Sequence, residues 1–149
     1  NWKPRLGLWV NAASGDQRPG DGTNQGFDPL YGATFAFYGY TGYFLLNNII
    51  SPSVRLSVQP TGRIRSELIY RTIWLESSRA AWVRANRGDP SGQDGDFVGQ
   101  EVDMRFSYGF FRWLEAELVY ALFLPGGFVA NTGPSPLSSF SYFQLTLRF

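Results

Sequence analysis

Hydrophobic and polar residues alternate along most of this chain, and a period of two is typical of β-strands whose two faces meet different surroundings. The clearest segment is 98–108. Its even-numbered positions are apolar with one exception, and its odd-numbered positions are small, polar or charged. Residues 113–124 repeat this arrangement, with Glu115 and Glu117 opposite an apolar face. Because only the link 109–112 separates the two segments, we expect them to form an antiparallel hairpin.

Four further segments show the same period. A second hairpin is predicted for residues 53–59 and 64–75, although three aliphatic residues of the latter fall on its charged face. Residues 5–12 alternate more loosely, and residues 140–149 alternate clearly. Most of these segments are close to the roughly 9–11 residues of a tilted transmembrane β-strand. The sequence therefore predicts an all-β fold with about six antiparallel strands.

The connections between the predicted strands differ in length in a regular way. The links after residues 59 and 108 are short, whereas 13–52, 76–97 and 125–139 are long and rich in Gly, Pro, Asn and Asp. Short turns on one side and long loops on the other are typical of outer-membrane barrels. This pattern puts both chain ends on the short-turn side and favours an antiparallel transmembrane β-barrel.

Aromatic residues make up 17% of the chain and collect near the predicted strand ends. Two such belts mark the membrane interfaces of a β-barrel. The alternative is a soluble β-sandwich with an aromatic core, which does not explain the clustering at strand ends. The residues expected at the interfaces are Trp74, Tyr108, Trp113, Phe140 and Phe149.

Six strands leave two open edges, and the smallest bacterial single-chain barrels have about 8 strands. Residues 34–50 are too few to supply two strands of about ten residues and a turn. We therefore expect residues 1–149 to be a single segment, the C-terminal strands of a larger barrel. Two placements are open for Thr34 to Ile50: an inward plug, or an outward strand in contact with lipid.

Composition excludes several kinds of chemistry. The chain has no His and no Cys, which removes the common nucleophilic triads, imidazole or thiolate metal sites and disulfides. A net charge of +1 gives no basic field for nucleic acid. Glu115 and Glu117 lie on a polar wall with no sign of burial, so we expect no enzyme activity and no cofactor. Asp89, Asp94 and Asp96 are weak candidates for a cation site, because their spacing matches no EF-hand loop and a solvated external loop accounts for them better.

The charged faces of the predicted strands would line a water-filled lumen. One interpretation is an arginine ladder that guides an anionic solute. The other, which we favour for any single residue, is a set of cross-strand ion pairs, because cations and anions are equal in number. The predicted lumen residues are Arg55, Arg65, Glu67, Arg71, Glu101, Asp103, Arg105, Glu115, Glu117 and Arg148.

Four stretches of sequence suggest a family. Residues 13–16 (ASGD), 27–31 (FDPLY), 38–39 (YG) and 142–149 (YFQLTLRF) together resemble the C-terminal portion of alginate-export-type outer-membrane porins. The chain departs from that pattern at Gly32, where Pro is usual, and in lacking His. The resemblance implies a larger barrel in the outer membrane of a Gram-negative-type cell, in contact with lipid. It also implies that the barrel-assembly machinery reads the terminal Phe149.

These observations lead to two main functional hypotheses. The first is an outer-membrane channel, a porin that passes hydrophilic solutes by passive diffusion, with anionic or polysaccharide solutes among the candidates. The second is a structural barrel that acts as a scaffold or sheath for partner proteins, with other chains completing the barrel. A third, a small closed barrel acting as an adhesin or a lipid-active enzyme, requires eight strands from this chain alone.

Overall fold

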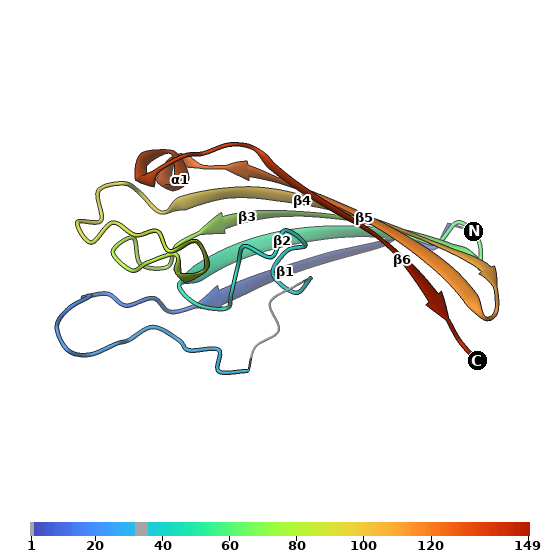
Figure 1. Ribbon diagram of the computed structural model, residues 1–149, viewed down its shortest axis with the longest axis horizontal. Helices are drawn as coiled ribbons and strands as arrows, with labels where there is room; N and C mark the ends of the chain where they lie inside the picture. Colours follow the sequence, from blue (N-terminus) through green and yellow to red (C-terminus); the bar gives the residue numbers. More distant parts are fainter. Residues whose placement is uncertain (1, 32–35) are drawn as a thin grey trace.

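Six antiparallel strands form one sheet in sequence order, from β1 at one edge to β6 at the other (Figure 1). The structure is a computed structural model that describes residues 2–31 and 36–149. Within these residues, helical structure is limited to one short turn, η1, and one short helix, α1. The all-β prediction is therefore confirmed, and the sheet is open. The elements are β1 (Arg5–Ala13), β2 (Ile49–Val58), β3 (Ile64–Trp74), η1 (Val83–Ala85), β4 (Phe97–Phe111), β5 (Leu114–Pro125), α1 (Gly127–Thr132) and β6 (Ser138–Leu147).

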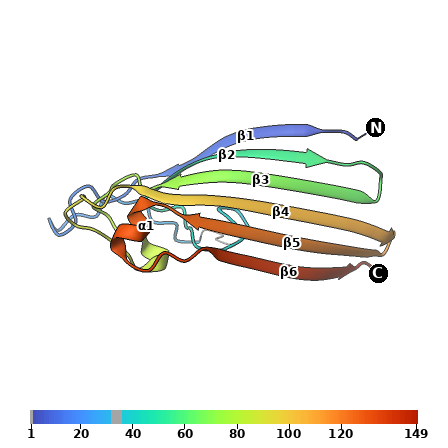
Figure 2. The ribbon, with the colours of Figure 1, turned by 90° about the horizontal axis from the view of Figure 1, so that it is seen from above.

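The long and short connections lie at opposite ends of the sheet, as the sequence predicts. Figure 2 shows both chain ends beside the tight turns, which we call the short-turn end. At the other end, the long-loop end, lie the connections 14–48, 75–96 and 126–137. The placement of loops and chain ends therefore matches the arrangement typical of outer-membrane barrels.

Two predicted strand boundaries are wrong for local reasons. The expected link 109–112 is shorter in the structure, because β4 runs on to Phe111 through an irregular register after Gly109. β2 begins at Ile49. The predicted strand begins only at residue 53, because Pro52 is a residue type that usually interrupts a strand. The β2–β3 register skips residues 51–52, which fits a position where Pro offers no N–H group to the neighbouring strand.

One face of the sheet is apolar and exposed along all six strands. Leu8 on β1 is 76% exposed, Met104 on β4 is 51% exposed and Leu145 on β6 is 58% exposed. Gln100, the polar exception on this face, accepts a hydrogen bond from the Tyr70 hydroxyl at 2.6 Å. We call this the outer face. Water-soluble proteins rarely expose so continuous an apolar surface.

The opposite, inner face carries the only large hydrophobic cluster within the described residues, at the long-loop end. There Ile73 and Leu75 pack with Phe44 and Trp82 from the loops and with Phe123 from β5. This explains why aliphatic residues interrupt the charged face of the 64–75 segment. They lie under loops, where the inner face is covered, and the charged residues lie further along the strands.

A bulge near the start of β4 changes the direction of one predicted side chain. Trp74 pairs with Phe97 and Ile73 pairs with Gly99, so Val98 is an extra residue between the two pairs. Val98 is consequently buried in the inner cluster, and its predicted place on the apolar outer face is wrong. Gly99 adopts φ +151°, and a Cβ atom there would meet the Leu124 carbonyl and the Phe123 ring.

We expect Gly99→Ala to lower the free energy of unfolding by about 1–3 kcal/mol, because it forces both a disfavoured φ and a close contact. The matched control is Gly62→Ala, since a Cβ at Gly62 meets no atom and should change stability by under about 0.5 kcal/mol. Urea unfolding in lipid vesicles, followed by tryptophan fluorescence, measures both. Equal losses at the two positions would contradict the assigned role of the bulge.

Candidate functional site

The strand register puts the predicted lumen residues on one face. Arg71 on β3 and Glu101 on β4 lie opposite each other on the inner face. Side chains alternate between the two faces along each strand, and the registers of the neighbouring strands then place every predicted lumen residue on the same inner face. The same register sends Met104 and Leu118 to the outer face. The inner face therefore gathers the charged side chains of the strands, and it is the candidate site.

Most of these charges are paired across neighbouring strands. Each pair is diagonal, between positions two residues apart in register, where long side chains can reach each other. These ion pairs neutralise most of the charged side chains on the inner face, in agreement with the ion-pair interpretation. Of the predicted lumen residues, all of which the structure describes, only Arg65 and Glu101 form no ion pair. The pairs are Arg55–Glu67 (3.6 Å), Arg71–Asp103 (2.6 Å), Arg105–Glu117 (2.6 Å) and Arg148–Glu115 (3.0 Å).

The pair of Arg71 and Asp103 differs from the others because it is buried. Each side chain is 1% exposed, whereas Arg148 in the pair with Glu115 is 64% exposed. Burial leaves the Nε and Nη1 groups of Arg71 and the Oδ1 atom of Asp103 without a hydrogen-bond partner. The hydroxyl of Ser51, also on the inner face, has no partner either. Unpaired buried polar groups of this kind are costly, and native structures contain few of them.

The first long loop folds back onto this wall. Of Thr34 to Ile50, residues 34 and 35 lie outside the described residues, 36–48 run along the inner face, and the last two begin β2. Thr41 donates a hydrogen bond to the Glu101 carboxylate through its hydroxyl, and its N–H approaches the same carboxylate at 3.5 Å. Tyr40 packs with Val119 and Ala121. The described part of the segment thus takes the inward of its two predicted placements (Figure 1).

The second long loop holds this segment from the opposite side. The indole N–H of Trp82 donates to the Tyr43 carbonyl at 2.9 Å, and Nε of Arg84 donates to the Gly42 carbonyl at 2.9 Å. At the end of the segment, the buried Asn48 amide donates to the carbonyl of Ser77 at 3.1 Å. The segment is therefore clamped between the wall and the second loop.

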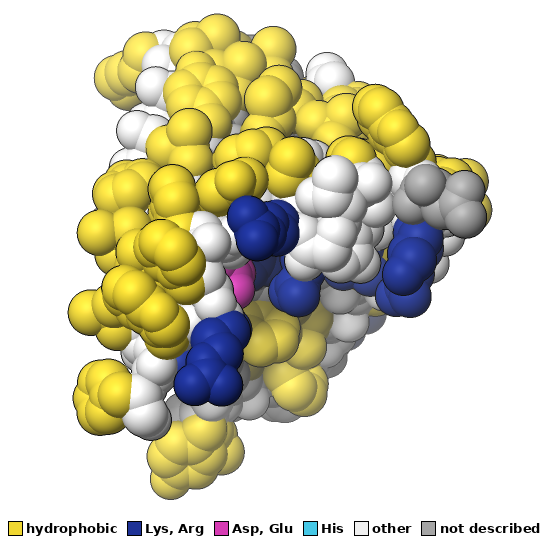
Figure 3. Space-filling view, turned by 90° about the vertical axis from the view of Figure 1, so that its right-hand side faces the viewer, with side chains coloured by type: hydrophobic (Ala, Val, Ile, Leu, Met, Phe, Trp, Pro, Cys, Tyr) yellow, Lys and Arg dark blue, Asp and Glu magenta, His cyan; other side chains and the backbone are white. Residues whose placement is uncertain are grey.

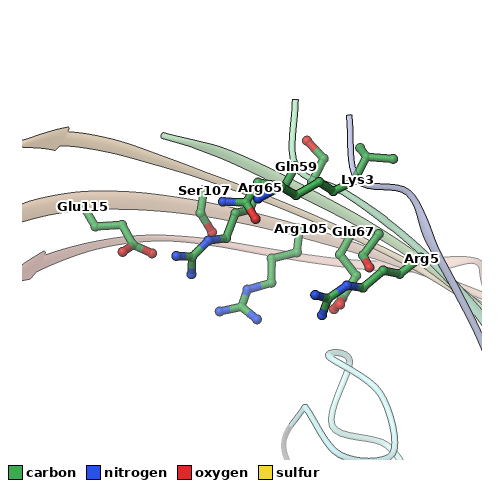
Figure 4. Close-up of a pocket in the computed structure, with 11 residues that line it drawn as sticks. Lys3, Arg5, Gln59, Arg65, Glu67, Arg105, Ser107 and Glu115 are labelled. Atoms are coloured by element: carbon green, nitrogen blue, oxygen red, sulfur yellow. The ribbon is translucent and has the colours of Figure 1, made fainter. Parts of the chain in front are cut away.

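A basic recess of about 350 Å³ opens on the inner face at the short-turn end. Figure 4 shows Arg5, Arg65 and Arg105 extending from different strands into this space. Viewed from the same end, Lys and Arg side chains gather in the hollow while hydrophobic side chains cover the outside (Figure 3). The recess is lined by Lys3, Arg5, Ser57, Val58, Gln59, Arg65, Ser66, Glu67, Arg105, Ser107 and Glu115.

Sequence reasoning missed two cations of this recess. Within the described part of the chain, Lys3, Arg5 and Arg65 take part in no ion pair, whereas Glu67 and Glu115 are each paired with an arginine. The recess therefore has an excess of unneutralised positive charge, although the chain as a whole is nearly neutral. The parity of residues 5–12 could have identified Arg5, but Lys3 precedes the strand and carries no periodic signal.

In the acidic loop that contains Asp89, Asp94 and Asp96, the Asp89 carboxylate is hydrogen-bonded by groups of the loop itself. Asp89 accepts hydrogen bonds from the hydroxyl of Ser91 at 2.5 Å and from the backbone N–H groups of Ser91, Gln93 and Asp94. These bonds, chiefly the one from the Ser91 hydroxyl, lower the pKa of Asp89 to about 2. The carbonyl of Asp96 accepts from the Leu75 N–H. Across the described ranges, no three acidic side chains gather in a group that could hold a metal ion.

The predicted interface aromatics fall into three positions. Trp74 lies against Phe97 near the long-loop end, with ring centroids 5.2 Å apart. Tyr108, Trp113 and Phe149 lie at the short-turn end, and Phe149 is fully exposed. Phe140 is different, because its register with Ala121 puts it on the inner face, packed against the cluster around Tyr40. That position is not the lipid-facing one that we expected.

An open antiparallel sheet with an exposed apolar face and a charged opposite face defines a sector of a transmembrane β-barrel wall. The chain belongs to a known family of such proteins, because the family model described as Alginate export matches residues 1–143. It is an outer-membrane transport family rather than an enzyme family, and its name points to polysaccharide export. A search of curated proteins and a search of solved structures each found no match.

We expect Arg71→Ala to destabilise the protein by about 3–5 kcal/mol, because it leaves the buried Asp103 carboxylate without its cation. Arg148→Ala, which breaks the exposed pair with Glu115, should cost under about 1 kcal/mol. Urea midpoints in lipid vesicles compare the two variants directly. A loss for Arg71→Ala no larger than that for Arg148→Ala would show that the buried pair does not hold the wall together.

Proposed function

We propose that this chain forms part of the wall of an outer-membrane channel that passes hydrophilic solutes by passive diffusion, with an anionic polysaccharide as the preferred solute. The observation that carries the proposal is the opposite chemistry of the two faces. Side chains of one face are apolar and exposed, and those of the other are charged and hydrogen-bonded across strands. Lipid outside and water inside is the environment that such a sheet requires.

The open edges support a larger assembly. In the described residues, β1 and β6 each pair with a strand on one side only. In hydrocarbon, each unpaired backbone group would cost several kcal/mol, so an open sheet edge does not persist there. We therefore propose that further strands, from the same polypeptide or from other chains, pair with β1 and β6 and close the barrel.

The recess at the short-turn end supports the preference for anions. Lys3 and Arg5 from the N-terminal segment and Arg65 from β3 approach one cavity, and none of the three is neutralised by a described carboxylate. A uronate polymer carries one carboxylate on each sugar, and guanidinium groups bind carboxylates with paired hydrogen bonds. Solvent-exposed cations of this kind attract an anion without holding it tightly, as conduction requires.

The structural sheath remains the second candidate, and one observation favours it. Four of the inner-face arginines are already neutralised by carboxylates, which suits a wall built for rigidity. Conductance separates the two hypotheses. The complete protein that carries this segment, purified and added to a planar bilayer, should produce discrete current steps. A bilayer that stays silent would favour the sheath.

We expect an oligo-uronate added on the short-turn side to block this current, and Arg65→Gln to weaken the block by roughly three- to tenfold, since one screened ion pair is lost. Arg63→Gln is the matched control, because Arg63 is exposed in the neighbouring turn and does not line the recess. Concentration series of the blocker give both constants. Equal effects of the two substitutions would contradict a solute contact at Arg65.

A further inference from the structure

We propose that Trp9 and Arg55 form a binding subsite for one sugar residue of a uronate polymer, in which the indole packs against the sugar ring and the guanidinium binds its carboxylate. This inference rests on the proposed function, the passage of an anionic polysaccharide. It adds a contact for the ring of the solute to the contacts for its charge. Four features of the inner face carry it.

The first feature is an aromatic side chain on the charged face. Trp9 lies opposite Ser53 on β2, and Ser53 lies opposite Arg71 on β3, so all three side chains are on the inner face. The indole is only partly buried, and within the described residues it belongs to neither of the two hydrophobic clusters. An indole that supports no core is available to pack against a ligand.

The second feature is the availability of Arg55. Its guanidinium lies over the Trp9 ring, with Cζ 5.5 Å from the ring centroid, in a cation–π contact. Of the four ion pairs among the described residues, the one between Arg55 and Glu67 is the longest at 3.6 Å, and the Arg55 side chain is 49% exposed. The other three arginines also donate a hydrogen bond to their carboxylate. Arg55 is held less tightly, so its N–H groups can bind a carboxylate of the solute.

The third feature is the small size of the neighbouring residues. Gly7 is the inner-face residue next to Trp9 on β1, and it lies opposite Arg55. On β2, Ser53 and Ser57 are the inner-face neighbours of Arg55. The three atoms nearest to a Cβ at Gly7 would all belong to the Arg55 side chain, at 3.7 Å or more, so packing does not require glycine there. The missing side chain leaves room beside the guanidinium.

The fourth feature is continuity with the basic recess. Arg5 and Ser57 lie opposite each other and line the recess, and Arg55 is the next inner-face residue along β2. Trp9 is four residues from Arg5 on β1, which is about 13 Å along the strand. A uronate polymer repeats a ring and a carboxylate at every sugar. One chain can therefore contact the cations of the recess and the subsite at the same time.

The two side chains together select the chemistry of the ligand. A pyranose ring carries hydroxyl groups around its edge, but its faces present C–H groups that pack against an indole. In a uronate, a carboxylate projects from the same ring, where a guanidinium can donate paired hydrogen bonds to it. An acyclic polyanion offers the charge without the ring, so it can use Arg55 but not Trp9.

The first test compares two ligands on the complete protein that carries this segment, held in lipid nanodiscs and titrated by calorimetry. The ligands are an oligo-uronate and an oligo-acrylate of equal charge, which has no sugar rings. Trp9→Ala should raise the dissociation constant of the oligo-uronate by roughly three- to tenfold and leave that of the oligo-acrylate unchanged. Arg55→Gln should raise both constants by roughly three- to tenfold. Equal effects of Trp9→Ala on the two ligands would show that the indole only positions Arg55.

Further variants control for the fold. Trp9→Phe keeps a flat aromatic face and should retain most of the affinity that Trp9→Ala loses. The matched control is Leu8→Ala, because Leu8 is the next residue on β1 but is 76% exposed on the outer face, and it should change neither constant. Migration of the unheated protein on gels checks that each variant is folded.

Gly7→Val tests the subsite with the indole still in place, even if Trp9→Ala does not fold. It adds bulk beside Arg55 at a position that accommodates a Cβ atom, and it should raise the oligo-uronate constant by about threefold or more. An unchanged constant would contradict a sugar ring at this place.

The outcomes separate the subsite from the channel, since calorimetry needs no current. If the oligo-uronate binds the wild type and Trp9→Ala leaves its constant unchanged, the subsite is wrong, and the channel is still judged by its conductance. If the oligo-uronate binds through Trp9 but the bilayer stays silent, the subsite is supported and passive diffusion is contradicted. If the oligo-uronate does not bind the wild type, the subsite and the preference for an anionic polysaccharide both fail.

Discussion

Backbone pairing along six neighbouring strands decides which side chains share a face, and the rest of the structure depends on this constraint. A slip of one residue in any pair would move charges such as Glu101 to the outer face and apolar residues such as Met104 to the inner face. In a bilayer that exchange is unfavourable on both sides, so the register and the two-sided chemistry support each other. The charged wall, the basic recess and the docked loop all follow from that register.

Much of the fold could be predicted from the period of two, because a strand between lipid and water repeats the same chemical contrast at every second residue. The prediction failed where another interaction replaced that contrast. Val98 turns inward at a bulge, Phe140 packs under Tyr40, and Pro52 sits inside a strand although it is a poor strand residue. Each of these exceptions depends on contacts with residues distant in sequence, and no local pattern contains them.

The candidate site was predictable in part for the same reason. Alternation identified the charged wall, but it gave no partners: Arg71 pairs with Asp103 on the neighbouring strand, and Glu101 accepts a hydrogen bond from Thr41, 60 residues away in the sequence. The sequence motif at residues 13–16 has a structural use: the Ser14 carbonyl accepts from the N–H groups of Phe27 and Asn48, and the Gly15 N–H donates to Glu76. It ties the base of the first long loop to the second, which helps to direct the intervening segment inward.

The most direct test of a lipid-facing outer side and a water-facing inner side is cysteine labelling in proteoliposomes, since the chain has no native cysteine. Single variants at Met104, Arg105, Glu115 and Leu118 sample both faces of adjacent strands. A water-soluble maleimide should label Arg105→Cys and Glu115→Cys, whereas a lipid-borne quencher should affect probes at Met104→Cys and Leu118→Cys. Labelling that does not alternate along β4 and β5, or that alternates in the opposite sense, would contradict a barrel wall.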